Sequence, residues 1–438
     1  IDFNFYSGDI YADLKKWNPA VIGIGGTTGT RKGSFKLAEI CKEALPKTPV
    51  VFGGIHATFT AEDTLKHVPE IDYVLKGEGE FSFLSFVEIF IEKKKGNLFN
   101  IPGLSYRHDN QIIHNKPVRI DDLDTLPLPA RELCEGNYKI KLDYLGIEAE
   151  FLMTSRGCPF ACDFCAASRM FPGGIRYRSI DNVKKEIDLI LSQKKVKALK
   201  IFDSTFTASR QHVLNFCEMI KPYNLLWECE IRVDTVDFEL MKKMKEAGCC
   251  YVDIGLETTD SKILQSIYKT INVKQVEDVL SWCRKLQIKT KVFFTFGHLG
   301  QSYQSCLNDA NYIKQNKDKI DFFATTVGIR VYPGTQLEKK AIAAGIIPTD
   351  FSWVKFKPSP WRHLLFEFED QLLLTQKHLG FYRLSKIVWK LVMNGTVGSF
   401  NYICELIFIN LYKLIRQLFL NIKQAGYQLK RASQKGNL

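Results

Sequence analysis

Short apolar runs alternate with amphipathic stretches over residues 1–96. The run AVIGIGG (20–26) is apolar throughout and ends in glycine, which is typical of a strand buried on both faces. The segment SFKLAEICKEAL (34–45) follows with the spacing of a helix, and further strands are predicted at 49–54 and 71–80. This alternation of strands and helices predicts an α/β fold with a doubly wound parallel sheet.

A second series of strands and helices extends over residues 151–335. Helical patterns such as SIDNVKKEIDLILSQ and TVDFELMKKMKEAG separate the apolar runs, and Ser179 and Thr235 are suitable residues to cap these helices. Six such units predict a partial (β/α)6 barrel, because the segment is too short for eight. The predicted strands are 151–156, 198–204, 225–234, 250–258, 290–297 and 322–333.

The two remaining segments differ from these series. Residues 97–150 contain a predicted hairpin around Asp109 and Asn110 and then a polar run punctuated by prolines, so we expect a linker. Residues 336–438 are apolar with basic interruptions, and we expect a helical C-terminal region. Charged residues interrupt its longest apolar run, which therefore does not resemble a membrane-spanning helix.

Length and cysteine content limit the classes of protein to which this chain can belong. The chain has 438 residues and only 12 cysteines, which is too few for a disulfide scaffold, and no signal peptide opens it. We therefore expect a reduced, cytoplasmic protein. The first residue is Ile1 rather than Met, and IDFNFYSGDI is typical of the end of a strand, so we expect the chain to begin inside a domain.

The net charge of +12 is concentrated at the C-terminal end. Residues 371–438 hold ten lysines and arginines and one acid, Glu405, whereas the rest of the chain is nearly neutral. This distribution argues against a general nucleic-acid-binding surface. Two interpretations of the basic, apolar tail remain open. Residues 395–438 could contact the inner face of a membrane or form a helical cap on the barrel mouth; the two are compatible, and a cap docked on a membrane would fit a lipid-like substrate.

Three cysteines provide the most specific chemical signal. Cys158, Cys162 and Cys165 follow one another as C-x3-C-x2-C directly after a predicted strand. Three thiolates in eight residues can wrap one metal cluster and leave one metal open to a small ligand. The alternatives are buried structural cysteines or a zinc site completed by a distant residue. Zinc sites usually combine two cysteine pairs, and no second C-x2-C is present.

This motif, with Phe164 directly before the last cysteine, resembles that of the radical S-adenosylmethionine (SAM) superfamily. The resemblance covers about residues 150–335 and agrees with the predicted partial barrel. It implies that Cys158, Cys162 and Cys165 hold a 4Fe–4S cluster whose fourth iron chelates SAM. It also implies reductive cleavage of SAM to a 5′-deoxyadenosyl radical, with electrons from a flavodoxin- or ferredoxin-type reductant.

Further SAM contacts are implied by position in the same family pattern. Asp203, Arg232 and Glu257 follow the second, third and fourth predicted strands, where side chains face a barrel mouth. We expect them, with Phe164, to contact SAM. The family often has two adjacent acids where this chain has Asp203 followed by serine. Its Gly-x-Pro-Gly-Glu pattern is replaced by GHLGQS at 297–302, to which we assign no role.

The N-terminal segment resembles the cobalamin-binding domain often fused before a radical SAM barrel. The resemblance is carried by VIGIGGTT, PVVFGGIHATF and IDYVLKGEGE. It implies a cobalamin at the carboxyl edge of the sheet, beside Gly25, Thr27, Gly53 and Gly54. Because glycine has no side chain, a bulky ligand can approach the backbone there. We interpret His56 as a turn or pocket-lining residue rather than a cobalt ligand.

These resemblances imply an enzyme that acts on a small-molecule substrate. The favoured hypothesis is a cobalamin-dependent radical SAM methyltransferase that acts on an unactivated carbon. A second hypothesis is a cyclase, rearrangement or oxidation enzyme with the same cofactors. A third is a non-catalytic cobalamin- or cluster-binding module, against which the open cysteine triplet argues. The sequence assigns no catalytic side chain.

Overall fold

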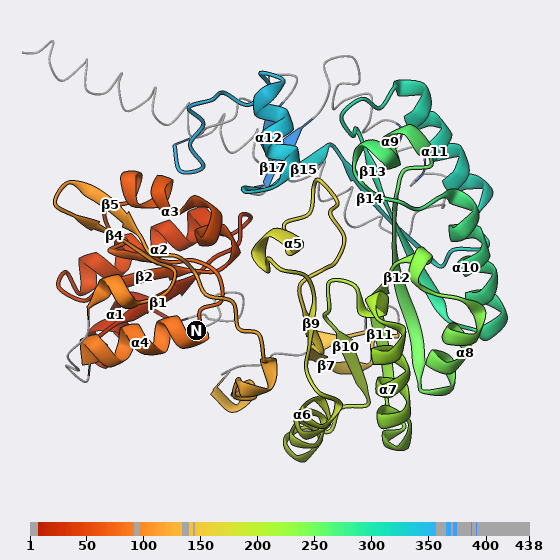
Figure 1. The fold of residues 1–438 in the computed structure, drawn as a ribbon, viewed down its shortest axis with the longest axis horizontal. Helices are drawn as coiled ribbons and strands as arrows, with labels where there is room; N and C mark the ends of the chain where they lie inside the picture. Colours follow the sequence, from red (N-terminus) through yellow and green to blue (C-terminus); the bar gives the residue numbers. More distant parts are fainter. Residues whose placement is uncertain are drawn as a thin grey trace, which may run out of the picture.

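In the computed structural model, an N-terminal α/β unit lies beside a larger open barrel (Figure 1). The short helix α5 (Ala167–Met170) belongs to the loop that carries the three cysteines, and this loop lies on the side of the barrel that faces the N-terminal unit. The structure describes residues 8–91, 97–133, 140–142, 145–355, 365–368 and 371–374 and the single positions 387 and 391.

The N-terminal unit contains a five-stranded sheet of order β1-β2-β3-β4-β5, in which the first three strands are parallel. The doubly wound sheet expected from the sequence is thereby confirmed. Its strands are β1 (Ile22–Gly25), β2 (Val50–Gly53), β3 (Tyr73–Leu75), β4 (Leu104–His108) and β5 (Gln111–His114). Its helices are α1 (Ile10–Trp17), α2 (Arg31–Ala44), α3 (Ile55–His67) and α4 (Glu80–Ile91).

The predicted hairpin is present, but its place in the fold differs from the expected linker. Asp109 and Asn110 form the turn with positive φ angles of 45° and 61°, as the two central residues of a tight hairpin require. Strand β4 pairs antiparallel with β3, so the hairpin extends the N-terminal sheet. The N-terminal unit therefore extends beyond residue 96 to include both strands.

The barrel consists of a seven-stranded sheet of order β14-β13-β12-β11-β10-β7-β6. Six strands are parallel, as the six predicted units require, and β6 (Ile140–Lys141) adds an antiparallel edge. The parallel strands are β7 (Glu148–Leu152), β10 (Ala198–Ile201), β11 (Leu226–Ile231), β12 (Cys249–Glu257), β13 (Lys289–Phe296) and β14 (Phe322–Val327).

Helices cover the outer face of this sheet (Figure 1). Along β13, buried side chains, most of which belong to the core under the helices, alternate without exception with half-buried side chains on the inner face. Trp227, Phe206 and Phe216 form an aromatic cluster in the outer core, with ring centroids 5.2–5.6 Å apart. The helices are α6 (Ile180–Gln193), α7 (Arg210–Ile220), α8 (Phe238–Glu246), α9 (Ser261–Ser266), α10 (Val273–Leu286) and α11 (Tyr303–Gln315).

The chain leaves the barrel after β14. Gly328, with a φ angle of 81°, separates β14 from β15 (Ile329–Val331), which forms a small antiparallel sheet with β17 (Gln371–Leu374) and β16 (Leu365–Phe368). Helix α12 (Gln336–Ala343) lies between them in sequence. No helix in the described part of the chain is long and apolar enough to cross a membrane. The tail at 395–438 lies outside the described residues, so its membrane contact stays a prediction.

The segment after α12 returns to the N-terminal unit. Trp353 packs edge-on against His56, with ring centroids 6.0 Å apart, and its carbonyl accepts a hydrogen bond of 3.2 Å from Arg31. His56 is fully buried beside Phe35 and Phe52. Burial and the charge of Arg31 lower the pKa of His56 to about 3, so this imidazole is neutral in the folded protein.

This buried histidine predicts an acid-sensitive fold. The unfolded chain binds a proton at His56 below its ordinary pKa of 6.5, whereas the folded chain does so only below about 3. The free energy of unfolding should therefore fall by about 1.4 kcal/mol per pH unit between these values because of His56 alone. We expect His56→Asn to reduce the pH slope of stability, measured by chemical denaturation, by this amount.

The matched control is Ala57→Gly, which changes a buried helical neighbour without adding or removing a titratable group. It should lower stability at every pH and leave the slope unchanged. An unchanged slope in His56→Asn would show that His56 is not the group responsible.

Candidate functional site

A cavity of about 350 Å³ opens at the carboxyl ends of the barrel strands. The three cysteines line it together with side chains from β11, β12, β13 and the segment after β14. Three of the four residues expected to contact SAM, namely Phe164, Arg232 and Glu257, line it as well. The cavity thus brings together residues from positions 158 to 332 of the chain.

The three thiols are free and half-buried. Burial raises the pKa of Cys162 and raises that of Cys165 to about 11, and the neighbouring thiols add to both effects. Two donors oppose this, because Arg232 Nη1 lies 3.8 Å from Cys162 Sγ and the Ala167 amide lies 3.5 Å from Cys165 Sγ. Three crowded thiols with donors aimed at sulfur suit an iron–sulfur cluster, because its iron ions keep the thiolates deprotonated and the donors balance the negative charge on sulfur.

The cysteine loop spans residues 157–175 and is closed by a short hairpin of β8 (Ser155–Arg156) and β9 (Arg176–Tyr177). Gly157 has a φ angle of 96°, and a Cβ atom there would lie 2.7 Å from the Gly174 carbonyl oxygen. The far side of the loop is held by Asp163, which is buried and forms an ion pair of 2.6 Å with Lys340 on α12. The loop is therefore fixed at its base and at its centre.

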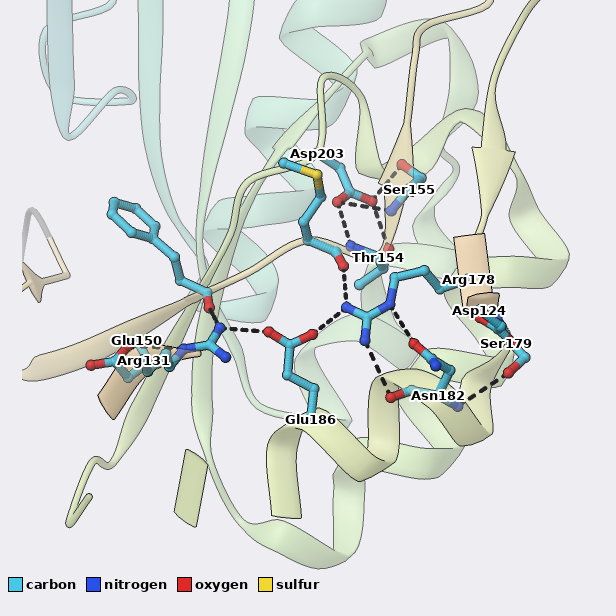
Figure 2. A network of polar contacts seen from close by, with 12 residues as sticks. Asp124, Arg131, Glu150, Thr154, Ser155, Arg178, Ser179, Asn182, Glu186 and Asp203 are labelled. Atoms are coloured by element: carbon cyan, nitrogen blue, oxygen red, sulfur yellow. Dashed lines mark hydrogen bonds and ion pairs between the residues drawn. The ribbon is translucent and has the colours of Figure 1, made fainter. Parts of the chain in front are cut away.

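Asp203, the fourth residue expected to contact SAM, is not among the residues that line the cavity. Figure 2 shows its carboxylate turned toward the segment between β7 and β8. It accepts four hydrogen bonds of 2.6–3.2 Å, from the backbone amides and the hydroxyls of Thr154 and Ser155. Only 2% of Asp203 is exposed. Its oxygens are thus engaged in fixing the start of the cysteine loop, and the geometry gives no support for a SAM contact.

A second buried carboxylate supports the same segment from below (Figure 2). Glu186 on α6 bridges two arginines, with 2.5 Å between its Oε1 and Arg131 Nη2 and its Oε2 bound to Arg178. The two guanidinium groups also donate to the carbonyl oxygens of Phe151 and Met153, at 2.8 Å each. The end of β7 is therefore held by charge-assisted hydrogen bonds just before the loop begins.

Arg232 reaches the cavity from the end of β11. Its guanidinium lies over the Phe160 ring at 3.7 Å from the centroid and pairs with Asp234 at 2.7 Å. Together with the contact to Cys162 Sγ, this places one fixed positive charge beside the cysteine loop. The predicted site residue Arg232 thus lies against the cysteines, where it can stabilise the negative charge of a cluster.

Glu257 ends β12 at a bulge, where the pairing register with β13 shifts. Its φ angle of 71° is rare for a residue with a side chain, and such strained conformations cluster at functional sites. Its carboxylate pairs with Lys269 at 2.8 Å. Gly255 makes room for this pair, because a Cβ atom there would lie 2.6 Å from Lys269 Nζ. Lys269 lies 6.0 Å from the centre of the Phe164 ring and was not identified from the sequence.

Two acidic residues on the cavity wall were also missed. Glu230 and Asp253 are direct neighbours on β11 and β12, and both line the cavity. Glu230 is exposed to the cavity, but the protein around it and the charge of Asp253 raise its pKa to about 7, against opposing effects of Lys200 and Lys291. The signal was present in the sequence: the acids of these otherwise apolar strands are two residues apart on β11 and four apart on β12, so they share the face turned into the barrel.

The segment GHLGQS, to which no role was assigned, has a structural one. Gln301 is buried, accepts hydrogen bonds from the backbone amides of Gly297 and His298, and donates to Asp309 at 2.8 Å. Asp309 also binds Thr258, directly after Glu257. His298, which lines the cavity, has a pKa lowered by burial to about 4 and is therefore neutral.

The glycines expected beside a cobalamin share one edge of the N-terminal sheet. Gly25 and Gly53 are paired neighbours at the carboxyl ends of β1 and β2, and a Cβ atom on either would meet nothing within 4 Å. Gly54 has a φ angle of 97° and lies against the Gly26 carbonyl. Thr27 is exposed at the same edge. Open space over a glycine-lined strand edge suits a bulky ligand.

The hydrogen bonds of Asp203 predict a loss of stability rather than of SAM affinity on substitution. Asp203→Asn places an amide nitrogen against donors, which should lower the free energy of unfolding by about 2–3 kcal/mol. The dissociation constant for SAM of the folded, reconstituted protein should change less than roughly threefold. Ser204→Ala, which alters an adjacent cavity residue, is the control and should leave stability unchanged. Unchanged stability with weakened SAM binding in Asp203→Asn would restore the original assignment.

The base of the cysteine loop yields a further test. Gly157→Ala should distort the loop, because the new Cβ atom collides with backbone. Gly174→Ala has a similar positive φ angle of 87° but open space around its Cβ position, so it suffers backbone strain alone, about 1–3 kcal/mol. After anaerobic reconstitution, iron and sulfide analysis should show clearly less cluster in Gly157→Ala than in Gly174→Ala. Equal cluster content would show that the collision is relieved elsewhere.

Comparison with known proteins agrees with this arrangement. The family model "Radical SAM superfamily" matches residues 152–313, and the model "B12 binding domain" matches residues 1–87. An uncharacterized methyltransferase, PH0819, of Pyrococcus horikoshii is 32% identical over 87% of this chain and 83% of its own length. The anaerobic magnesium-protoporphyrin IX monomethyl ester cyclase of Cereibacter sphaeroides is 26% identical over 65% of this chain, which spans 47% of that protein.

A solved structure shares the whole arrangement of domains. The radical SAM methyltransferase TsrM of Kitasatospora setae, with cobalamin and a [4Fe-4S] cluster bound, superposes with a TM-score of 0.68 at 15% identity, over 87% of this chain and 81% of that one. This likeness concerns the fold, whereas the family rests on the domain matches and the relative with 32% identity. The chain therefore belongs to the radical SAM superfamily and, within it, to the proteins that carry an N-terminal B12-binding domain.

Proposed function

We propose that this protein is a cobalamin-dependent radical SAM methyltransferase that acts on an unactivated carbon of a small molecule. The observation that carries the proposal is the set of three thiols at one cavity that also contains Arg232, Glu257 and Phe164. The N-terminal unit, which the B12-binding family model matches, lies on the side of the barrel where this loop is found (Figure 1).

The chain's own residues have separate tasks in this proposal. Cys158, Cys162 and Cys165 would hold the cluster, and Arg232 would donate to the Cys162 sulfur and balance its charge. Glu257, held by Lys269, offers carboxylate oxygens as acceptors for the hydroxyls of a bound nucleoside. When bound, the cluster and SAM supply a 5′-deoxyadenosyl radical, and cobalamin supplies the methyl group.

Aromatic residues complete the cavity wall. Phe160 and Phe164 line the cavity beside the cysteines, and Phe293 lines it from β13. Such apolar walls exclude water, which protects reactive species from side reactions. Glu230 and Asp253 add hydrogen-bond acceptors deeper in the barrel, where they can orient a substrate.

Methyl transfer is favoured over the alternatives by the relatives. The protein with 32% identity is named a methyltransferase, and the hopanoid C-3 methylase of Methylococcus capsulatus is 28% identical over 65% of this chain and 54% of its own length. The cyclases, at 26% identity, support a ring-forming reaction as the second candidate. A lipid-like substrate, such as the name of the hopanoid methylase suggests for that protein, is one class to test.

The deciding experiment counts products. The protein is reconstituted anaerobically with iron, sulfide and cobalamin, then reduced and given SAM with candidate substrates. We expect 5′-deoxyadenosine and S-adenosylhomocysteine in comparable amounts, because one SAM is cleaved and another donates its methyl group. Mass spectrometry quantifies both.

The control is Cys162→Ala, which removes one cluster ligand and should abolish 5′-deoxyadenosine. Deoxyadenosine without S-adenosylhomocysteine would favour a cyclase, a rearrangement or an oxidation. If neither product forms although iron analysis confirms the cluster, the proposal of an enzyme is wrong.

A further inference from the structure

One buried carboxylate of the N-terminal domain holds the base of the cysteine loop. Glu78 follows β3, and only 8% of it is exposed. Its Oε1 accepts a hydrogen bond of 2.9 Å from Arg156, and its Oε2 accepts hydrogen bonds of 2.7 Å from Arg176 and 3.0 Å from the Ile120 amide. Burial raises the pKa of Glu78, but the bonds from Arg176, Ile120 and Arg156 outweigh burial and hold it below its usual value.

The two arginines occupy matching positions at the two ends of the loop. Arg156 on β8 and Arg176 on β9 are direct partners in the hairpin register. Arg156 directly precedes Gly157 and Cys158, and Arg176 directly follows the loop. Through these two arginines, the carboxylate of Glu78 therefore binds both β8, where the cysteine loop begins, and β9, where it ends. Hydrogen bonds between charged groups are the stronger ones in proteins, and removing one partner of a buried pair is costly.

On its other side, Glu78 is connected to the glycine edge of the B12-binding domain. The Gly77 amide donates to Thr58 Oγ1 at 3.0 Å, and Thr58 Oγ1 donates to the Gly54 carbonyl at 2.9 Å. Gly54 is one of the residues expected beside cobalamin. Two hydrogen bonds, the peptide link from Gly77 to Glu78 and the bonds of Glu78 to the arginines thus join that edge to the base of the cysteine loop.

We propose that Glu78 is a positioning residue that sets the placement of the cysteine loop relative to the cobalamin edge of the N-terminal domain. This inference rests on the proposed function, since it concerns the distance between its two cofactors. Glu78 touches neither the cysteines nor the cavity in the described contacts and acts through Arg156 and Arg176. Its loss should leave the loop able to bind iron but free to shift.

The matched pair of variants is Glu78→Gln and Glu80→Gln. Both acids bind Arg156, but Glu80 does so at the surface and contacts only that arginine among the pairs described here. Arg176→Lys is a milder third variant, which keeps a positive charge beside Glu78 but removes the guanidinium whose Nη1 binds both Glu78 and the Ile120 carbonyl. It keeps the test informative if Glu78→Gln folds poorly.

Two measurements on the reconstituted protein test the proposal. The first is hydrogen–deuterium exchange of residues 157–175, which we expect to be roughly tenfold faster in Glu78→Gln than in the wild type. The second is the effect of cob(II)alamin on the relaxation of the reduced cluster in electron paramagnetic resonance. This effect depends on the distance between the two centres and should weaken in Glu78→Gln, by a smaller amount in Arg176→Lys, and not in Glu80→Gln.

The outcomes are distinct. Unchanged exchange and unchanged relaxation in Glu78→Gln, or equal effects in Glu80→Gln, would overturn the positioning role. If the wild type shows no relaxation effect because cobalamin does not bind, the proposed function fails. Hydrogen–deuterium exchange in the loop then tests the role of Glu78 independently. Faster exchange in Glu78→Gln but not in Glu80→Gln supports the role of Glu78 in holding β8 and β9, and exchange equal to that of the wild type refutes it.

Discussion

The site depends on a loop that carries almost no regular structure and must nevertheless present three thiols to one cavity. A loop of this kind is costly to order, because each fixed residue loses about 1–2 kcal/mol of backbone entropy. Here buried carboxylates compensate for that cost: Asp203 binds the segment before the loop, and Asp163 binds Lys340 at its centre. Because these acids accept hydrogen bonds from several chain segments, the loop is fixed by contacts far apart in sequence.

The barrel interior explains why charged residues occur on strands of a buried sheet. Outward residues pack under helices and form the large apolar core, whereas inward residues face the cavity. Arg232 and Glu230 share the inward face of the β11 region, and Asp253 and Glu257 share that of β12. Because successive side chains of a strand point to opposite faces, the same alternation places apolar residues in the core and polar residues at the site.

The sequence was sufficient for the fold class because that information is local: apolar runs, helical spacing and glycines define the strands and helices. The cysteine motif likewise lies within eight residues. The role of Asp203 was not predictable in the same way, because the direction of its side chain depends on Thr154 and Ser155, about 50 residues earlier. Likewise, the turn at Asp109 predicted the hairpin but not its partner, which β3 supplies from a distant segment.

The break at Gly328 has a consequence for the size of the interior. A closed barrel has a radius fixed by its number of strands and their stagger, so its lumen cannot change without breaking hydrogen bonds. In this chain β14 does not pair with β6 or β7, and the chain turns away into β15 instead. Among the described strands the sheet is thus a curved wall whose first and last strands are not joined, so strand number and stagger alone do not fix the width of its interior.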